Sequence, residues 1–154
     1  MRDDLSSLLD CIIQHQKKKI ILITDFLNRE FEFKHLLNGK VEDKLIEIID
    51  FEDEIILKID LCDYEIAQYT DKIERIAGFN PLKSNSFSSE ILINEITANK
   101  KRIDVLLNEI KMIREDNVKK MKEISEDTLR SADELGRIDK VKNIFSKDLR
   151  SSWF

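Results

Sequence analysis

Two residues that often bind metal ions, Cys11 and His15, lie four positions apart in a segment that we expect to be helical. Residues at i and i+4 share one helix face, so the thiol and the imidazole could bind one Zn²⁺. Both also fall on the apolar side of that helix, and the only other histidine is His35. We therefore adopt the competing interpretation, in which both side chains pack in the core.

The pair Glu32 and His35 has the Glu-x-x-His spacing of di-iron helical bundles. Such a centre needs this motif on each of two helices, and the sequence contains it once. No glycine-rich phosphate loop, Cys-x-x-Cys pair or His-Glu-x-x-His motif is present, and the whole chain has three glycines. We therefore expect no metal, no cofactor, no catalytic residues and no enzymatic activity.

An acidic run and a basic run also invite a functional interpretation. The acidic run could be a cation site, but carboxylates on an exposed helix do not converge on one point as those of a calcium loop do. The basic run Lys17-Lys18-Lys19 is too short to outweigh the negative body around it. We expect both to be solvated surface. The acidic run consists of Asp50, Glu52, Asp53 and Glu54.

A long helix is the strongest signal in the sequence. Between Leu45 and Ile76 the apolar residues alternate in steps of four and three, a period typical of coiled coils. Only Glu52 interrupts this series, which we call the seam. The seam residues are Leu45, Ile48, Ile55, Ile59, Cys62, Ile66, Tyr69, Ile73 and Ile76.

Helix-stop signals divide the chain. Asn38-Gly39 favours a break because both residues tolerate the left-handed conformation, and Gly78 followed by Pro81 ends the second helix. We predict helices at about 4–37, 41–77 and 90–126 within a coiled-coil body at 1–128, followed by an amphipathic segment at 129–154. The fold class is all-α: an elongated antiparallel helical hairpin or three-helix coiled-coil bundle with a short, flexible C-terminal helix.

Asn99 and Asn117 occupy positions in the third helix that the heptad would make apolar. A polar residue in such a position commonly fixes the register of a coiled coil at a cost in stability, and we expect that role here. The heptad pattern leaves open whether the helices pair within one chain or between two chains.

Charge and hydropathy argue against some classes of partner. The net charge is −5, and residues 1–99 carry 20 acidic and 12 basic side chains, which argues against nucleic acid. No apolar run approaches the roughly 18 residues of a membrane span, and the first ten residues are too polar for a signal peptide. We expect a cytoplasmic protein without stable membrane insertion, in which Cys11 and Cys62 are buried thiols, with a disulfide between them as the alternative.

The C-terminal segment repeats apolar residues at helical spacing. Ile138, Val141, Phe145 and Leu149 stand at i, i+3, i+7 and i+11, so the segment can form an amphipathic helix on a surface. The chain then ends in Trp153-Phe154. Aromatic residues at a terminus are either pinned to a surface or exposed as a contact site.

Three stretches of the sequence have a recognisable layout. A first leucine-rich helix breaks at Leu36-Leu37-Asn38-Gly39-Lys40-Val41-Glu42 and resumes from Leu45-Ile46-Glu47-Ile48-Ile49 through Asp53-Glu54-Ile55-Ile56. A later helix carries Asn99-Lys100-Lys101-Arg102-Ile103-Asp104-Val105-Leu106-Leu107. This layout, over about residues 5–124, resembles the FlgN-like flagellar export chaperones. This chain is rich in isoleucine where that family favours leucine.

The resemblance implies a non-enzymatic chaperone of the bacterial flagellar type III secretion system. Such a protein binds and masks the C-terminal helix of hook-filament junction proteins, contacts the export apparatus, and is a monomer or weak homodimer. The alternative is a scaffolding coiled coil that self-associates through the seam between Leu45 and Ile76. By position, the resemblance assigns partner binding to Ile138, Val141, Ile144, Phe145, Leu149, Trp153 and Phe154.

Overall fold

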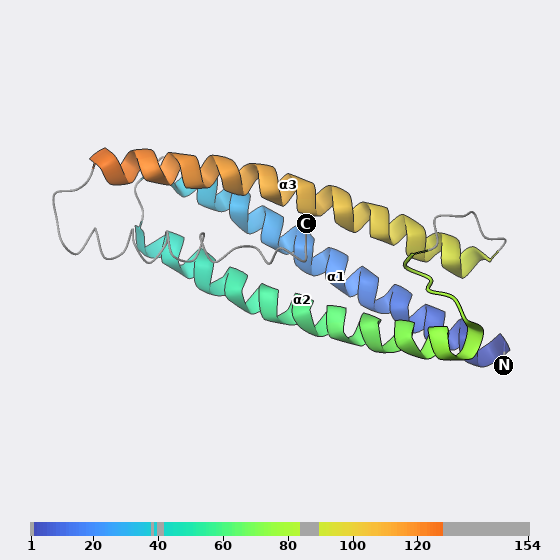
Figure 1. The fold of residues 1–154 in the computed structure, drawn as a ribbon. Helices are drawn as coiled ribbons and strands as arrows, with labels where there is room; N and C mark the ends of the chain where they lie inside the picture. The colour runs from blue at the N-terminus through green and yellow to red at the C-terminus, as the bar shows by residue number, and fades with distance from the viewer. Residues whose placement is uncertain (1, 38, 40–41, 84–89, 128–154) are drawn as a thin grey trace. The chain divides into compact units, whose positions relative to one another are not determined.

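The computed structural model describes residues 2–37, 39, 42–83 and 90–127. It contains three long helices, α1 (Arg2–Leu37), α2 (Glu42–Ala77) and α3 (Ile91–Asp127), which Figure 1 shows in chain order. The described residues are 93% helical and include no strand. The predicted all-α helical bundle is confirmed, and α1 packs against both α2 and α3.

The chain divides into two compact units, and every helix contributes to both of them. Unit 1 contains the described residues within 1–24 and 56–105. Unit 2 contains those within 25–55 and 106–127. Each unit has its own core cluster and its own polar layer.

In unit 1, side-chain contacts define the direction of the helices. The rings of His15 and Tyr69 lie 5.5 Å apart, and Lys19 Nζ lies 2.6 Å from Asp63 Oδ1, so α1 and α2 are antiparallel. Gln16 on α1 bonds to the carbonyl of Ile96 on α3. One core cluster of this unit consists of Leu9, Ile12, Ile13, Ile66, Ile73, Ile93 and Ile96.

Unit 2 has the same three-helix packing with larger side chains on α1. Phe26 and Phe33 are fully buried there, and Met121 of α3 belongs to the same core as Phe33. Burying a side chain of this size stabilises the fold by about 2 kcal/mol relative to leaving it exposed. One core cluster of this unit consists of Phe33, Leu37, Leu45, Ile48, Ile49 and Met121.

The seam of α2 is covered within a single chain. Leu45, Ile48, Ile55, Ile59, Cys62, Ile66 and Ile73 are all buried, Tyr69 is half-buried, and Ile76 near the helix end is exposed. The heptad pattern therefore reflects packing of α2 against α1 and α3 of its own chain.

The end of α2 follows the predicted glycine stop. Gly78 has φ of +74°, and its N–H donates to the carbonyl of Glu74 at 2.9 Å. In the turn that follows, Asn80 Oδ1 accepts a hydrogen bond from Leu82 N, and Lys100 of α3 donates to the Leu82 carbonyl. None of the three described helices is both long enough and apolar enough to cross a membrane.

Candidate partner-binding site

Three large apolar side chains lie on the solvent side of α2 in unit 1. Leu57, Leu61 and Tyr64 stand at i, i+4 and i+7, and each is between 61% and 65% exposed. With 3.6 residues per turn, this spacing places them in one row about 10 Å long on a single helix face. We call this row the α2 stripe.

The α2 stripe faces away from the core. Ile59, Cys62 and Ile66 are buried on the opposite side of the same helix segment. Single exposed apolar residues are ordinary on protein surfaces, but a row of three with helical spacing is typical of a helix that packs against another chain. The stripe is therefore a second apolar face of α2, in addition to the seam.

Charged residues border the α2 stripe on both sides. Lys58 and Glu65 are seven positions apart and therefore lie on the same flank, while Asp60 lies on the other flank. On the adjoining helix α1, Lys19 pairs with Asp63 and so neutralises that carboxylate. The stripe is thus an apolar row with a charged rim, the usual composition of a helix-binding surface.

The α2 stripe was not predicted from the sequence, because the seven-residue repeat of the seam is the stronger pattern on the same helix. A signal was present: Leu57, Leu61 and Tyr64 repeat between the seam positions and cannot share the face of the seam. The residues predicted to bind a partner all lie at 138–154, outside the described residues. Those seven assignments therefore stay predictions.

Unit 2 contains a buried polar layer made by all three helices. Glu30 of α1, Glu52 of α2, and Arg114 and Asn117 of α3 are all buried, with Glu30 at 0% and Glu52 at 3% exposure. Asn117 Nδ2 donates to Glu30 Oε2 at 2.9 Å and to the Glu30 carbonyl at 3.1 Å. Arg114 Nη1 lies 3.8 Å from Glu30 Oε1, and its guanidinium is 5.8 Å from the ring of Phe26.

Burial controls the charges of this layer. Removal from water, together with the charge of Glu30, raises the pKa of Glu52 from 4.5 to about 10. Burial raises the pKa of Glu30 too, but Arg114 and the hydrogen bond from Asn117 oppose that rise. The pair therefore shares a proton: Glu52 is neutral at pH 7 and donates it in a hydrogen bond to Glu30, which carries the charge that Arg114 balances.

Glu52 corrects one prediction from the sequence. The acidic run was expected to form a solvated face, and Asp50, Asp53 and Glu54 are indeed exposed. Glu52 is buried instead, because it occupies a seam position on the face of α2 that packs against the core. The interruption of the seam by Glu52 and the polar position of Asn117 were both visible in the sequence. Glu30 gave the same signal, because it stands four residues after Phe26 and three before Phe33 in the apolar series of α1, whereas Arg114 gave none.

Unit 1 contains a smaller polar layer. Gln16 is buried on α1; its Nε2 donates to the Ile96 carbonyl, and its Oε1 accepts a hydrogen bond from Asn99 Nδ2 at 3.2 Å. Asn99 thus has a hydrogen-bond partner on another helix. A residue that fixes the register of a coiled coil needs such a partner. Asn99 and Asn117, the two asparagines at heptad positions of α3, thus contribute to one polar layer in each unit.

Cys11 and His15 do share one helix face, as predicted. His15 Nδ1 forms a 2.8 Å hydrogen bond with the carbonyl of Cys11, and the His15 ring packs on Tyr69. Both Cys11 and Cys62 are free thiols, and the described residues include no group of three or more potential metal ligands. His15 is accounted for by packing and a backbone hydrogen bond.

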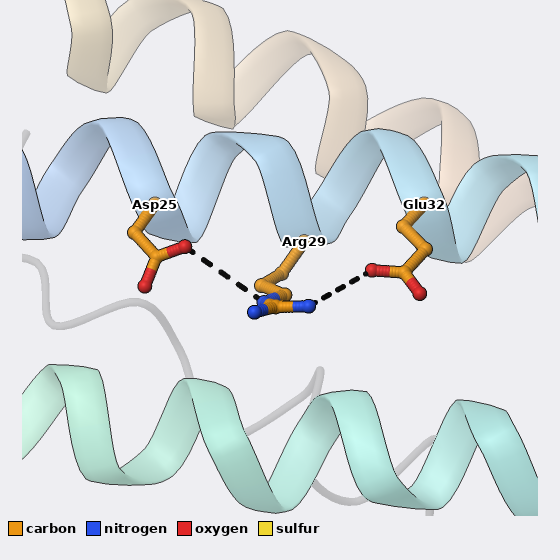
Figure 2. A network of polar contacts seen from close by, with 3 residues as sticks. All are labelled: Asp25, Arg29 and Glu32. Atoms are coloured by element: carbon orange, nitrogen blue, oxygen red, sulfur yellow. Dashed lines mark hydrogen bonds and ion pairs between the residues drawn. The ribbon is translucent and has the colours of Figure 1, made fainter.

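Arg29 of α1 is the centre of a surface network in unit 2. Figure 2 shows its guanidinium between Asp25 and Glu32, with contacts of 3.8 Å and 3.1 Å. The same guanidinium lies 4.4 Å from the ring centre of Phe51 on α2. The adjoining hollow of about 300 Å³ is open and is lined by residues of both charges, so the network ties α1 to α2 and leaves no enclosed chamber there.

Comparison of the chain with protein-family models, with curated proteins and with solved structures found no match.

Proposed function

We propose that this protein is a chaperone that binds and masks an amphipathic helix of a client protein on the α2 stripe. The observation that carries the proposal is the exposure of Leu57, Leu61 and Tyr64 on a helix whose other apolar face is already covered. A client helix with apolar residues at i, i+3 or i+4, and i+7 would complete a four-helix arrangement along α2. Binding of this kind uses buried area alone and needs no nucleotide.

The layout that resembles the FlgN-like family supports a specific client class. On that basis the clients are hook-filament junction proteins, bound through their C-terminal helix in the cytoplasm and released at the flagellar export apparatus. The segment at 138–154 would add further apolar contacts to the client. A site of standard size buries on the order of 800 Å² on each partner, more than a row of three side chains supplies, so this second contact is part of the proposal.

The scaffolding alternative receives less support. It requires self-association through the seam, and seven of the nine seam residues are buried against α1 and α3 of the same chain. A dimer through the seam would have to separate these helices first. The α2 stripe needs no such rearrangement.

Binding assays with substituted chains test the proposal. The full chain is mixed with the C-terminal peptide of a hook-filament junction protein, and affinity is measured by titration calorimetry. Leu57→Ser and Leu61→Ser should each weaken binding about tenfold, since each removes roughly 1.5 kcal/mol of apolar burial. Val105→Ser is the matched control, because Val105 is 52% exposed on α3, outside the stripe.

All three variants should unfold within about 0.5 kcal/mol of the wild type, because the substituted side chains are exposed. A chain lacking residues 137–154 should keep its fold and bind the peptide more weakly. Equal affinity of Leu61→Ser and Val105→Ser for the client would remove the stripe from the proposal. No binding of any such peptide to the wild type would overturn the flagellar assignment.

A further inference from the structure

The negative charge of the protein surface is concentrated on α2. Among the residues whose exposure the structure describes, α2 carries ten carboxylates and four basic side chains that are exposed or half-buried. The corresponding numbers are four and five on α1, and six and seven on α3, so these two helices are close to neutral. The carboxylates of α2 belong to Asp43, Glu47, Asp50, Asp53, Glu54, Asp60, Asp63, Glu65, Asp71 and Glu74, and the basic side chains to Lys44, Lys58, Lys72 and Arg75.

Carboxylates stand beyond both ends of the α2 stripe, on the same helix face. Glu54 precedes Leu57 by three residues and Asp71 follows Tyr64 by seven, and these spacings keep side chains on one side of a helix. Both carboxylates are exposed. The exposed apolar row and the acidic surface therefore coincide on one helix, and a helix that covers the row meets carboxylates beyond each end of it.

This charge distribution restricts what can cover the stripe. An acidic helix is repelled, because like charges placed opposite each other at an interface cost free energy. A second copy of α2 would bring the same excess of carboxylates to the contact and is opposed for that reason. A helix with lysine or arginine beside its apolar residues is attracted instead, and its basic side chains obtain partners on α2.

We propose that the helix bound by the α2 stripe is basic: lysine or arginine side chains flank its apolar row and face carboxylates of α2, including Glu54 and Asp71. This inference rests on the proposed function, because it names the chemistry of the client helix for that same site. An apolar row with helical spacing occurs on many helices and selects little by itself. The acidic surface adds selectivity, since it speeds the encounter with basic helices and disfavours acidic ones.

Three synthetic peptides test this inference on the full chain. All have the same helical row of leucines at i, i+4 and i+7, and their flanking positions carry lysine, glutamine or glutamate. In titration calorimetry the lysine peptide should bind about tenfold more tightly than the glutamine peptide, and the glutamate peptide should bind most weakly. Raising the salt from about 0.05 M to about 0.5 M should remove most of this difference, because exposed charges are screened.

Charge reversal beside the stripe gives a matched comparison. The variant with Glu54→Lys and Asp71→Lys should bind the lysine peptide about tenfold more weakly than the wild type, and the glutamate peptide more tightly. The control variant, Glu109→Lys with Glu115→Lys, makes the same change in net charge on α3 and should alter either affinity by less than about threefold. All four positions are exposed, so both variants should unfold like the wild type.

The outcomes separate this inference from the proposed function. Equal affinity of the wild type for the three peptides would overturn the basic client and leave the stripe as a helix-binding site. If Leu61→Ser binds the lysine peptide as tightly as the wild type does, the peptide contacts the acidic surface alone, and both proposals are wrong. No binding of any of the three peptides would also refute both.

Two other occupants of the stripe would be recognised in the same experiments. Self-association of the free chain that Leu61→Ser abolishes and the lysine peptide does not reverse would make a second copy the occupant. Tighter binding of the lysine peptide after removal of residues 137–154 would assign the stripe to that segment of the chain. Either result would replace the basic client.

Discussion

Glu52 occupies a position of α2 where the heptad favours an apolar side chain, and its carboxyl group is almost fully buried. An isolated buried carboxylate would cost several kcal/mol, so the group is retained in its neutral form. The hydrogen bond from this neutral acid to Glu30 lets two glutamates share the single charge that Arg114 balances. The two residues have the same chemistry and opposite roles.

These opposite roles predict different effects of the same substitution. Glu52→Gln keeps a neutral side chain that can donate a hydrogen bond to Glu30 and need not take up a proton on folding, so this variant should be at least as stable as the wild type to urea at pH 7. Glu30→Gln removes the negative charge beside buried Arg114 and should cost about 3 kcal/mol. Similar losses for the two variants would show that the charge does not reside on Glu30.

The buried proton also predicts a dependence of stability on pH. The pKa of Glu52 rises from 4.5 to about 10 on folding, so between these values the folded chain holds a proton that the unfolded chain has released. Stability is therefore greatest below pH 4.5 as far as this group is concerned, and falls as pH rises, by up to about 1.4 kcal/mol per unit.

Urea unfolding at pH 5.5 and pH 8.5 checks this slope. The wild type should lose more stability between the two conditions than Glu52→Gln, which cannot release a proton at this position. Glu54→Gln removes an exposed carboxylate from the same helix and should keep the wild-type slope. A slope in Glu52→Gln as steep as in the wild type would assign the effect to other groups.

At the scale of single helices, the sequence predicted the helix bounds well, because the signals that begin and end a helix are local. The observed helices begin and end within two residues of those predicted, because Gly78 acts through its own backbone conformation and the apolar period acts over single turns. The same apolar period predicted that the seam residues pack against other helices. What the sequence could not supply was the pairing, since identical heptads serve contacts within a chain and between chains.

The candidate sites were predicted less well, for a physical reason. The buried layer of unit 2 depends on residues from three helices. Glu30, Glu52 and Asn117 each interrupt an apolar stripe, whereas Arg114 does not. Arg114 is a long side chain whose apolar stem can pack in a core while its charge finds a distant partner. Such a residue looks like any surface arginine until the helices are assembled.

Gly78 gives a prediction about the stability of the C-terminal end of α2. Its φ of +74° lies in the left-handed region, and a Cβ built there has nothing within 4 Å, so the only penalty for a side chain is backbone strain. Gly78→Ala should lower the free energy of unfolding by about 1 kcal/mol. Gly78→Asn should cost less, because asparagine tolerates this conformation better. Equal thermal unfolding of both variants and the wild type would contradict the strain argument.

At the scale of the whole molecule, each of the two units has one polar layer that joins a buried polar residue of α1 to an asparagine of α3. Asn99 meets Gln16 in unit 1, and Asn117 meets Glu30 in unit 2. Apolar heptads alone allow helices to slide by a turn or to exchange between chains. Two polar contacts at fixed positions penalise such slips, because each slip leaves buried polar atoms without partners.

If the polar contact fixes the register, single and double substitutions in unit 1 should change the free energy of unfolding in opposite directions. Asn99→Leu alone removes the donor to Gln16 Oε1 and should destabilise the chain by about 1–2 kcal/mol in urea. The double variant Gln16→Leu with Asn99→Leu removes both partners and should be at least as stable as the wild type. Light scattering should then detect additional oligomers in the double variant, because the apolar surfaces no longer specify one register. If the double variant is more stable than the wild type and has the wild-type mass, the polar layer has no part in specifying the register. If both variants are less stable than the wild type, the polar layer is a net stabilising contact.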